Sequence, residues 1–244
     1  LSRLINWWDD QKRAPRILLT TVNAISQRTV PVDVLRQRRL VAQKGKRLEI
    51  GVMQDFFTQN GYVRTDTVRE VGEYAIRGGI VDLYPAGYKD PVRIDLFGDE
   101  IDSIKSFDAG SQRTKKKMNG FRLQPATEFM LDQDSIYRFR SAYRQNFGVV
   151  RDDDPLYEAV SEGRRYNGMD HWLPLFFEHM ETVFDYVPDA EITFDHHADQ
   201  ALQERLRQID DFYQARLTLA SSLEKKKKGK KGKDVSLSGS IYQP

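Results

Sequence analysis

The sequence predicts an α/β fold in which part of a parallel-sheet domain carries an inserted α+β domain with an antiparallel sheet. A continuous apolar run at residues 16–22 is typical of a strand buried in a parallel sheet. Runs that alternate apolar and polar residues fill residues 62–107, as expected for antiparallel strands with one buried face. Residues 131–220 instead show apolar residues at helical spacing. Hydrophobic residues make up 39% of the 244, which is enough to build these cores.

Residues 1–45 are expected to form the end of the α/β domain. A short amphipathic segment precedes the strand at 16–22, and Asn23 can cap the helical turn that follows. A second short strand, at residues 39–43, ends in a Lys-Gly-Lys turn. These elements are too few for an independent domain, and the chain begins without Met. We therefore expect a piece of a longer protein whose first strands lie elsewhere.

Residues 46–130 are expected to form the inserted α+β domain. An amphipathic helix at residues 48–60 ends at Asn60-Gly61, a pair suited to a helix C-cap. Turn-forming Gly, Pro and Asp residues separate five alternating runs, which predict strands at residues 62–65, 73–77, 80–84, 92–97 and 101–107. Because strands in such a series pair with their sequence neighbours, we expect a separately folded antiparallel meander packed on the helix.

Residues 131–223 are expected to form a mostly helical domain. Apolar residues three and four apart, together with capping residues, predict helices at residues 134–147, 155–163 and 199–223. A return to a strand is expected at residues 182–187. The stretch that follows, residues 224–244, is rich in Lys, Gly and Ser and is predicted to be a flexible linker.

The charge of the chain is unevenly distributed. Seven lysines lie within residues 225–233, and without them the formal net charge changes from +2 to −5. An acidic body argues against a broad phosphate-binding face. Because no aromatic residue interleaves the lysines, a solvated linker is favoured over a nucleic-acid or membrane tail. The chain has no cysteine, no signal-peptide pattern and no apolar run of about 18 residues, so a cytoplasmic location is expected.

No catalytic, metal or cofactor site is predicted in these residues. A phosphate loop requires Gly-x-x-x-x-Gly-Lys-Ser/Thr, which the sequence lacks. The string Asp99-Glu-Ile-Asp102 resembles a magnesium-binding box but falls in a predicted hairpin, so we interpret it as a turn. His196 and His197 are adjacent and are expected to point apart, which does not favour a metal site. We expect no ATP hydrolysis by this chain.

Three motifs carry a resemblance to a known family. The string Gly-Glu-Tyr-Ala-Ile-Arg-Gly-Gly-Ile-Val-Asp-Leu-Tyr-Pro-Ala at residues 72–86 is followed by Val-Arg-Ile-Asp-Leu-Phe-Gly-Asp-Glu-Ile at residues 92–101. A second motif spans residues 160–174 and contains Trp-Leu-Pro, and a third combines residues 18–28 with 44–48. In this order the motifs resemble the amino-terminal UvrB-homology module of transcription-repair coupling factors, the Mfd family.

The resemblance implies a partner and the residues that contact it. In this family the second domain recruits the repair protein UvrA, partly through arginines, which implies Arg77 and Arg64 as UvrA-binding residues. A guanidinium suits bidentate pairing with carboxylates of a partner. Arg77 could instead pair within its own hairpin, for example with Glu73. Val81 could supply an apolar anchor if its strand face is open, although alternation can bury it.

The resemblance also implies a domain order and a cellular role. Residues 1–45 correspond to the end of domain 1a, 46–130 to domain 2 and 131–223 to domain 1b. The implied role is UvrA recruitment in transcription-coupled nucleotide excision repair. The family's ATP-driven DNA translocase motors and its RNA-polymerase-binding module are absent here, so ATP, Mg, duplex DNA and RNA polymerase belong to the parent protein. Two alternatives stay open: a fragment of a UvrB-like DNA-handling enzyme, or an autoinhibitory scaffold that holds the parent closed.

Overall fold

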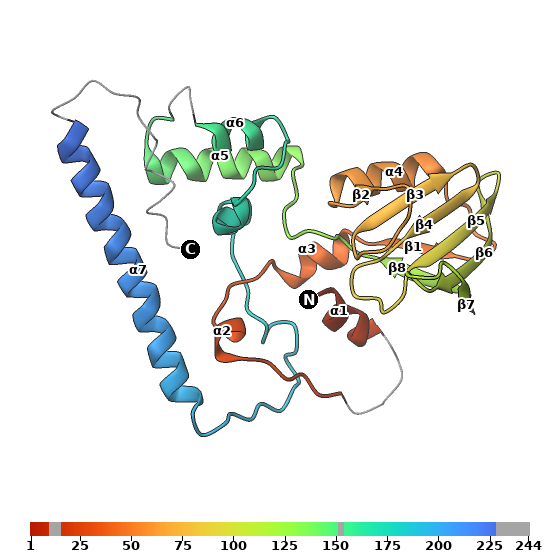
Figure 1. Cartoon of the computed structure of the whole chain (residues 1–244), viewed down its shortest axis with the longest axis horizontal. Helices are drawn as coiled ribbons and strands as arrows, with labels where there is room; N and C mark the ends of the chain where they lie inside the picture. Colours follow the sequence, from red (N-terminus) through yellow and green to blue (C-terminus); the bar gives the residue numbers. More distant parts are fainter. Residues whose placement is uncertain (10–15, 151–153, 228–244) are drawn as a thin grey trace. The chain divides into compact units, whose positions relative to one another are not determined.

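The computed structural model describes residues 1–9, 16–150 and 154–227. The chain divides into two compact units, drawn together in Figure 1. The first unit comprises Leu1–Pro15 and Val30–Met130, and the second comprises Arg16–Thr29 and Leu131–Pro244. Within the described ranges, no helix is both long enough and apolar enough to cross a membrane.

The first unit is a mixed α/β structure with a six-stranded sheet and a two-stranded antiparallel sheet. Its helices are α1 (Ser2–Asp9), α3 (Val32–Gln37) and α4 (Ile50–Gln59). Its strands are β1 (Leu40–Gln43), β2 (Val63–Arg64), β3 (Glu73–Arg77), β4 (Ile80–Leu83), β5 (Val92–Phe97), β6 (Glu100–Phe107), β7 (Thr114–Met118) and β8 (Gly120–Leu123).

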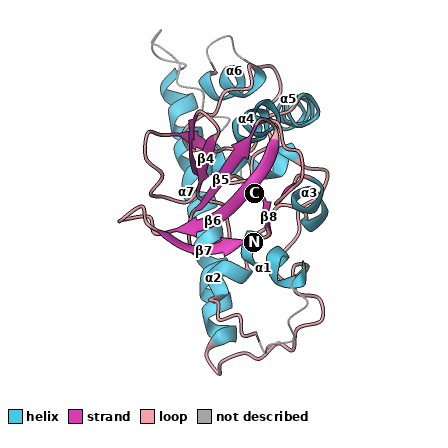
Figure 2. Ribbon diagram, turned by 90° about the vertical axis from the view of Figure 1, so that its right-hand side faces the viewer, coloured by secondary structure: helices cyan, strands magenta, loops and turns pink. Residues whose placement is uncertain are grey.

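The larger sheet is mixed and not purely antiparallel. Its strands follow the order β2-β3-β4-β5-β6-β7, and Figure 2 shows β4 to β7 side by side. Pairs from β3 onward are antiparallel, as predicted, but β2 runs parallel to β3 with Val63 opposite Glu73. The connection between β2 and β3 returns the chain to the same end of the sheet, so the meander prediction was wrong for this one pair.

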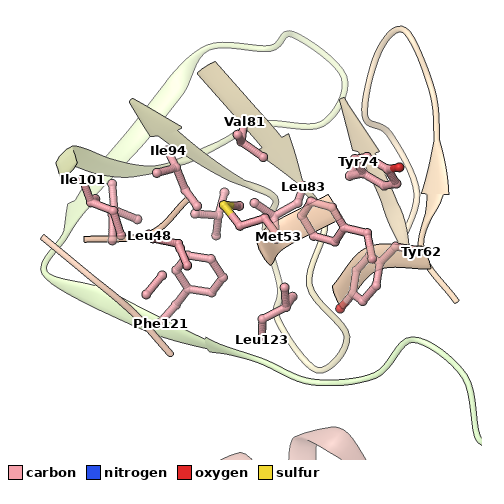
Figure 3. Close-up of a cluster of buried hydrophobic side chains, with 14 residues drawn as sticks. Leu48, Met53, Tyr62, Tyr74, Val81, Leu83, Ile94, Ile101, Phe121 and Leu123 are labelled. Atoms are coloured by element: carbon pink, nitrogen blue, oxygen red, sulfur yellow. The ribbon is translucent and has the colours of Figure 1, made fainter. Parts of the chain in front are cut away.

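The alternating runs form strands because one side chain in two reaches a shared core. Met53 and Phe57 of α4 are fully buried against the sheet, and the Phe57 and Tyr74 rings stack with centroids 4.2 Å apart. Figure 3 shows this core, in which Met53 of α4 lies among side chains of the large sheet and of β8. The Tyr62 hydroxyl donates to the Gln124 carbonyl oxygen at 2.7 Å, and burial raises the pKa of this phenol. Burial on this side fixes which residues face the opposite side of the sheet.

The predicted end of α4 is confirmed. The Asn60 N–H donates to the Phe56 carbonyl oxygen, and the Tyr62 N–H donates to the Phe57 carbonyl oxygen, both at 3.0 Å. Gly61 lies between them with φ of 79°, a backbone conformation that favours glycine. This cap turns the chain directly into β2.

Two strands of the first unit lie where none was predicted. β7 reads Thr-Lys-Lys-Lys-Met and lacks apolar alternation, yet it pairs with β6 as an edge strand. β8 pairs antiparallel with β1, with Leu40 opposite Leu123. The strand predicted at residues 39–43 is therefore confirmed as β1, and its partner comes from about 80 residues later in the chain.

The second unit is mainly helical. Its helices are α2 (Val22–Ile25), α5 (Gln133–Phe147), α6 (Pro155–Ser161), the 3₁₀ helix η1 (Met169–Phe176) and α7 (Ala198–Lys227). Aromatic side chains join α5 to η1, with the Phe139 and Phe176 rings stacked at 4.9 Å. Asp154 caps α6 by accepting the Tyr157 N–H at 3.1 Å, and it also accepts the Tyr143 hydroxyl at 2.6 Å. The helices predicted at 134–147, 155–163 and 199–223 are present with small differences in their limits.

Several local predictions for the second unit were wrong. Residues 16–22 form no strand, because no neighbouring strand pairs with them in the described chain, and Ile17 is 87% exposed. Thr21, not Asn23, caps α2 by accepting the Ala24 N–H at 3.3 Å. Residues 182–187 form turns in place of a strand. Residues 224–227 belong to α7 and not to the predicted linker, and residues 228–244, the rest of that prediction, lie outside the described residues.

Candidate partner-binding site

The face of the large sheet opposite α4 carries a set of charged side chains. Strand alternation puts Val81 and Ile94 into the core, so their strand neighbours Asp82 and Arg93 face the other way. The register aligns Asp82 with Arg93, and Arg93 with Lys105, across β4, β5 and β6. We call this surface the charged face; its members are Arg77, Ile80, Asp82, Arg93, Asp95, Phe97 and Lys105.

Asp82 is the centre of the charged face. Its side chain is only 1% exposed, and a buried carboxylate requires a paired cation. Arg93 supplies one in bidentate form: its Nε donates to Oδ1 at 2.6 Å and its Nη2 donates to Oδ2 at 2.9 Å. Arg77 donates a further hydrogen bond from Nη2 to Oδ2. One carboxylate on β4 thus holds arginines from both neighbouring strands.

Arg93 is fixed on its other side as well. Its guanidinium lies over the Phe107 ring, 4.9 Å from the centroid, which is a cation–π geometry. The hydrogen bond to Asp82 raises the pKa of Arg93. Phe107 belongs to a small apolar cluster with Val68 and Ala75 that covers one end of this sheet face. Arg93 therefore acts as an inner, structural cation of the face.

A second ion pair lies beside the first. Lys105 Nζ donates to Asp95 Oδ2 at 2.7 Å, and the Ser103 hydroxyl donates to the same oxygen. Burial acts to raise the pKa of Asp95, but these two hydrogen bonds outweigh it and hold the pKa below its ordinary value. The charges of Asp95 and Lys105 largely cancel, so this pair adds polarity to the face without net charge.

Arg77 is an exposed cation of the charged face. Its side chain remains 55% exposed although it contacts Asp82. The alternative of pairing within the hairpin is thus realised, but the partner is Asp82 and not Glu73. The Glu73 carboxylate instead accepts the backbone N–H groups of Arg69 and Glu70 at 2.7 and 2.8 Å. Arg77 is both paired and accessible.

Arg64 lies on the other side of the sheet. It is exposed on β2 and stands opposite Tyr74 in the parallel pair. Paired residues of parallel strands point to the same face, and Tyr74 belongs to the core under α4. The structure therefore does not bring Arg64 and Arg77 onto one face.

Val81 does not meet the condition for an apolar anchor. Its side chain is 0% exposed and is part of the core that contacts α4. The strand period of two puts its neighbour Ile80 on the charged face, where it is 39% exposed and stands opposite Arg77. Phe97 is 86% exposed at the end of β5 on the same face. The alternation in the sequence could have identified Ile80 as the outward-facing residue, because neighbours on a strand such as Ile80 and Val81 face opposite sides of the sheet.

The other chemical motifs are structural. Asp99 lies in the turn between β5 and β6, as predicted; its carboxylate accepts a hydrogen bond from Arg47 at 2.9 Å and its carbonyl oxygen accepts the Leu48 N–H at 2.7 Å. His196 and His197 do not point apart, because they lie in a turn before α7 with ring centroids 3.8 Å apart. Across the described ranges, no three His, Asp or Glu side chains gather in a way that could hold a metal ion.

Known proteins resemble this chain over most of its length. Residues 40–129, from the first residue of β1 to just beyond β8, match the family model of the UvrB interaction domain. The transcription-repair-coupling factor of Haemophilus influenzae is 38% identical over 208 residues, covering 85% of this chain and 18% of that protein. That of Escherichia coli is 42% identical over 173 residues, covering 70% and 15%. That of Bacillus subtilis is 29% identical over 208 residues, covering 77% and 18%.

The chain spans less than one fifth of the length of these relatives. The matches nevertheless extend over both compact units, because they cover more of the chain than the first unit alone contains. The chain is a homologue of the amino-terminal region of the transcription-repair-coupling factors and contains a UvrB interaction domain.

Proposed function

We propose that this chain recruits UvrA as part of a transcription-repair-coupling factor that acts in transcription-coupled nucleotide excision repair. The observation that carries the proposal is the match of residues 40–129, which include both sheets of the first unit, to a UvrB interaction domain. The chemistry of the charged face supports a protein partner, because it combines an exposed arginine with exposed apolar side chains.

The charged face supports a specific arrangement of contacts. Arg77 lies opposite Ile80 in the β3–β4 hairpin, and Phe97 stands at the end of the next strand. Arginine and aromatic residues are the types that most often dominate binding energy at interface centres. Arg93 and Lys105 are matched by Asp82 and Asp95, whereas Arg77 shares Asp82 with Arg93 and keeps an exposed positive charge. We therefore place Arg77 at the centre, against a carboxylate of UvrA, with Ile80 and Phe97 as apolar contacts in place of Val81.

Arg64 is a second UvrA contact, at the edge of the sheet. Since it lies on the α4 side of β2, a partner that touches both Arg64 and Arg77 must reach around this edge strand. The edge is accessible, because Val63 is 62% exposed beside Arg64. The charged face alone is sufficient for the main contact, and Arg64 adds to it.

The domain order of the family is the second part of the proposal. We assign residues 1–45 to the end of domain 1a, 46–130 to domain 2, 131–223 to domain 1b and 224–244 to a linker. The pairing of β1 with β8 supports moving the start of domain 2 back to residue 40.

The remaining activities are assigned to the whole protein. We propose that the parent is a cytoplasmic, ATP-dependent DNA translocase that displaces stalled RNA polymerase. ATP and Mg binding, and the contacts with duplex DNA and RNA polymerase, belong to segments beyond these residues. The chain itself serves recruitment.

Calorimetric titration of purified UvrA into this chain tests the proposal. We expect saturable binding that Arg77→Ala weakens. The matched control is Arg164→Ala, since Arg164 is 60% exposed and paired with Glu162, much as Arg77 is 55% exposed and paired with Asp82. Absence of binding by the wild-type chain overturns recruitment by these residues. Retention of radiolabelled ATP and duplex DNA in a filter assay would favour a UvrB-like enzyme instead.

A further inference from the structure

The environment of Asp82 decides whether its carboxylate is a fixed hydrogen-bond acceptor or a mobile surface acid. Asp82 lies inside β4, with Ala75 of β3 and Arg93 of β5 as its register partners. Strand pairing on both sides fixes its backbone, and its side chain is 1% exposed. The carboxylate is therefore a fixed acceptor on the charged face, in contrast to a mobile surface acid.

Arg93 meets the requirement for charge compensation by itself. It contacts both oxygens of Asp82, and its own guanidinium is held over Phe107. The side chain of Arg93 is 24% exposed, so this pair is largely shielded from water. Arg77 is not needed to neutralise Asp82. The contact between Asp82 and Arg77 has its main consequence for Arg77.

Arg77 is anchored through one nitrogen. Within the described part of the chain, the one hydrogen bond of its guanidinium runs from Nη2 to Asp82 Oδ2. A guanidinium has five N–H donors, so those on Nε and Nη1 remain available to a partner. A long side chain that must be ordered during binding weakens affinity by about 2- to 10-fold. An arginine that is already ordered avoids this loss.

We propose that Asp82 is a positioning residue for partner recognition: it holds Arg77 in one orientation, with the remaining donors of the guanidinium presented to a carboxylate of UvrA. This inference rests on the proposed function. It assigns to a buried residue, which cannot touch the partner, a measurable share of the affinity. The positioning role predicts that removing the negative charge of Asp82 weakens binding. Charge alone predicts the opposite, because a more positive face would bind an acidic partner more tightly.

The test combines a binding cycle with a measurement on the free protein. UvrA is titrated calorimetrically into wild type, Asp82→Asn, Arg77→Ala and the double variant, with circular dichroism melts to confirm folding. Asp82→Asn is expected to weaken binding about 2- to 10-fold in the wild-type background and to have no effect in the Arg77→Ala background. In the unbound wild type, ¹⁵N spectra of arginine side chains should show slow rotation of the Arg77 guanidinium, identified by its loss in Arg77→Ala.

Each outcome decides one of the two proposals. Equal or tighter binding by a folded Asp82→Asn, or an equal loss in both backgrounds, overturns the positioning role while recruitment stands. A freely rotating Arg77 guanidinium in the unbound wild type overturns it even if Asp82→Asn does not fold. Absence of wild-type binding overturns recruitment, and with it the partner part of this inference.

Discussion

Replacing Arg77 with alanine separates binding from stability at the charged face. The fold should survive, because Asp82 keeps its bidentate partner Arg93 after Arg77 is removed. The lost contact joins a 55% exposed cation to a buried carboxylate, and exposed ion pairs contribute about 0.2–1 kcal/mol to stability. We expect the free energy of unfolding, measured by urea titration, to fall by about 1 kcal/mol or less.

The effect of Arg77→Ala on binding should be larger. An arginine anchor at the centre of an interface contributes about 2 kcal/mol or more, which corresponds to about a 30-fold change in the dissociation constant. Calorimetric titration of UvrA measures this change, with Arg164→Ala expected to bind like wild type. An arginine at the rim would instead cost well under about 1 kcal/mol and would mainly change the salt dependence of the association rate.

Two results would refute this reasoning. If Arg77→Ala binds UvrA as tightly as wild type, Arg77 serves only its hairpin and the charged face is misassigned. If the variant loses about 3 kcal/mol of stability or more, the contact with Asp82 is part of the core and not a surface ion pair. Calorimetric titration detects the first case, because it measures binding. Urea titration detects the second, because it measures the free energy of unfolding.

Three further predictions concern Arg93, the pairing of β1 with β8, and Asp108. Arg93→Ala leaves the buried Asp82 with one partial partner and should lower the free energy of unfolding by about 3 kcal/mol in a urea titration; a change equal to that of Arg77→Ala would contradict this. A chain limited to residues 40–130 should melt cooperatively by circular dichroism, and one limited to 46–130 should melt at a lower temperature because β8 loses its partner β1; equal midpoints would show that β1 is dispensable. Hydrogen bonds from Ser111 and Lys115 lower the pKa of Asp108 to about 2, so its contribution to stability is present above about pH 4 and is lost as the pH falls toward 2. Asp108→Asn should flatten the dependence of the unfolding free energy on pH in this window, as followed by urea titrations, whereas an unchanged slope would contradict it.

The strands that the sequence predicted correctly are those whose signal is local. β3 to β6 alternate cleanly, and turn residues separate them, so both the strands and their antiparallel pairing can be read from neighbouring positions. β7 lacks this signal because it is an edge strand, where lysines are tolerated and even protect the edge. β8 depends on β1, about 80 residues earlier, and no local pattern reports that pairing.

The candidate site was predicted in part for a similar reason. Alternation separates Val81 from Ile80 and Asp82, so the faces could be assigned from the sequence. The meeting of Asp82 with Arg93 depends on the length of the connection between β4 and β5, which sets the register. The parallel direction of β2 likewise depends on its loop to β3, and this decides that Arg64 faces away from Arg77. Residue types were visible in the sequence, but the register that brings them together was not.

The arrangement of charges explains how a sheet face can be both stable and ready to bind. A buried carboxylate weakens a fold unless a cation compensates for it, and Arg93 does so from within the sheet. Arg77 shares Asp82 with Arg93, so its positive charge is only partly neutralised. Because its side chain is 55% exposed, it stays hydrated in the free protein and loses this water only when a partner binds. Ile80 lies opposite Arg77 and Phe97 lies on the next strand of the same face, so a partner that reaches Arg77 can also cover apolar surface. We therefore expect selectivity for an acidic, partly apolar partner, because an exposed cation held by Asp82 lies on the same face as two exposed hydrophobic side chains.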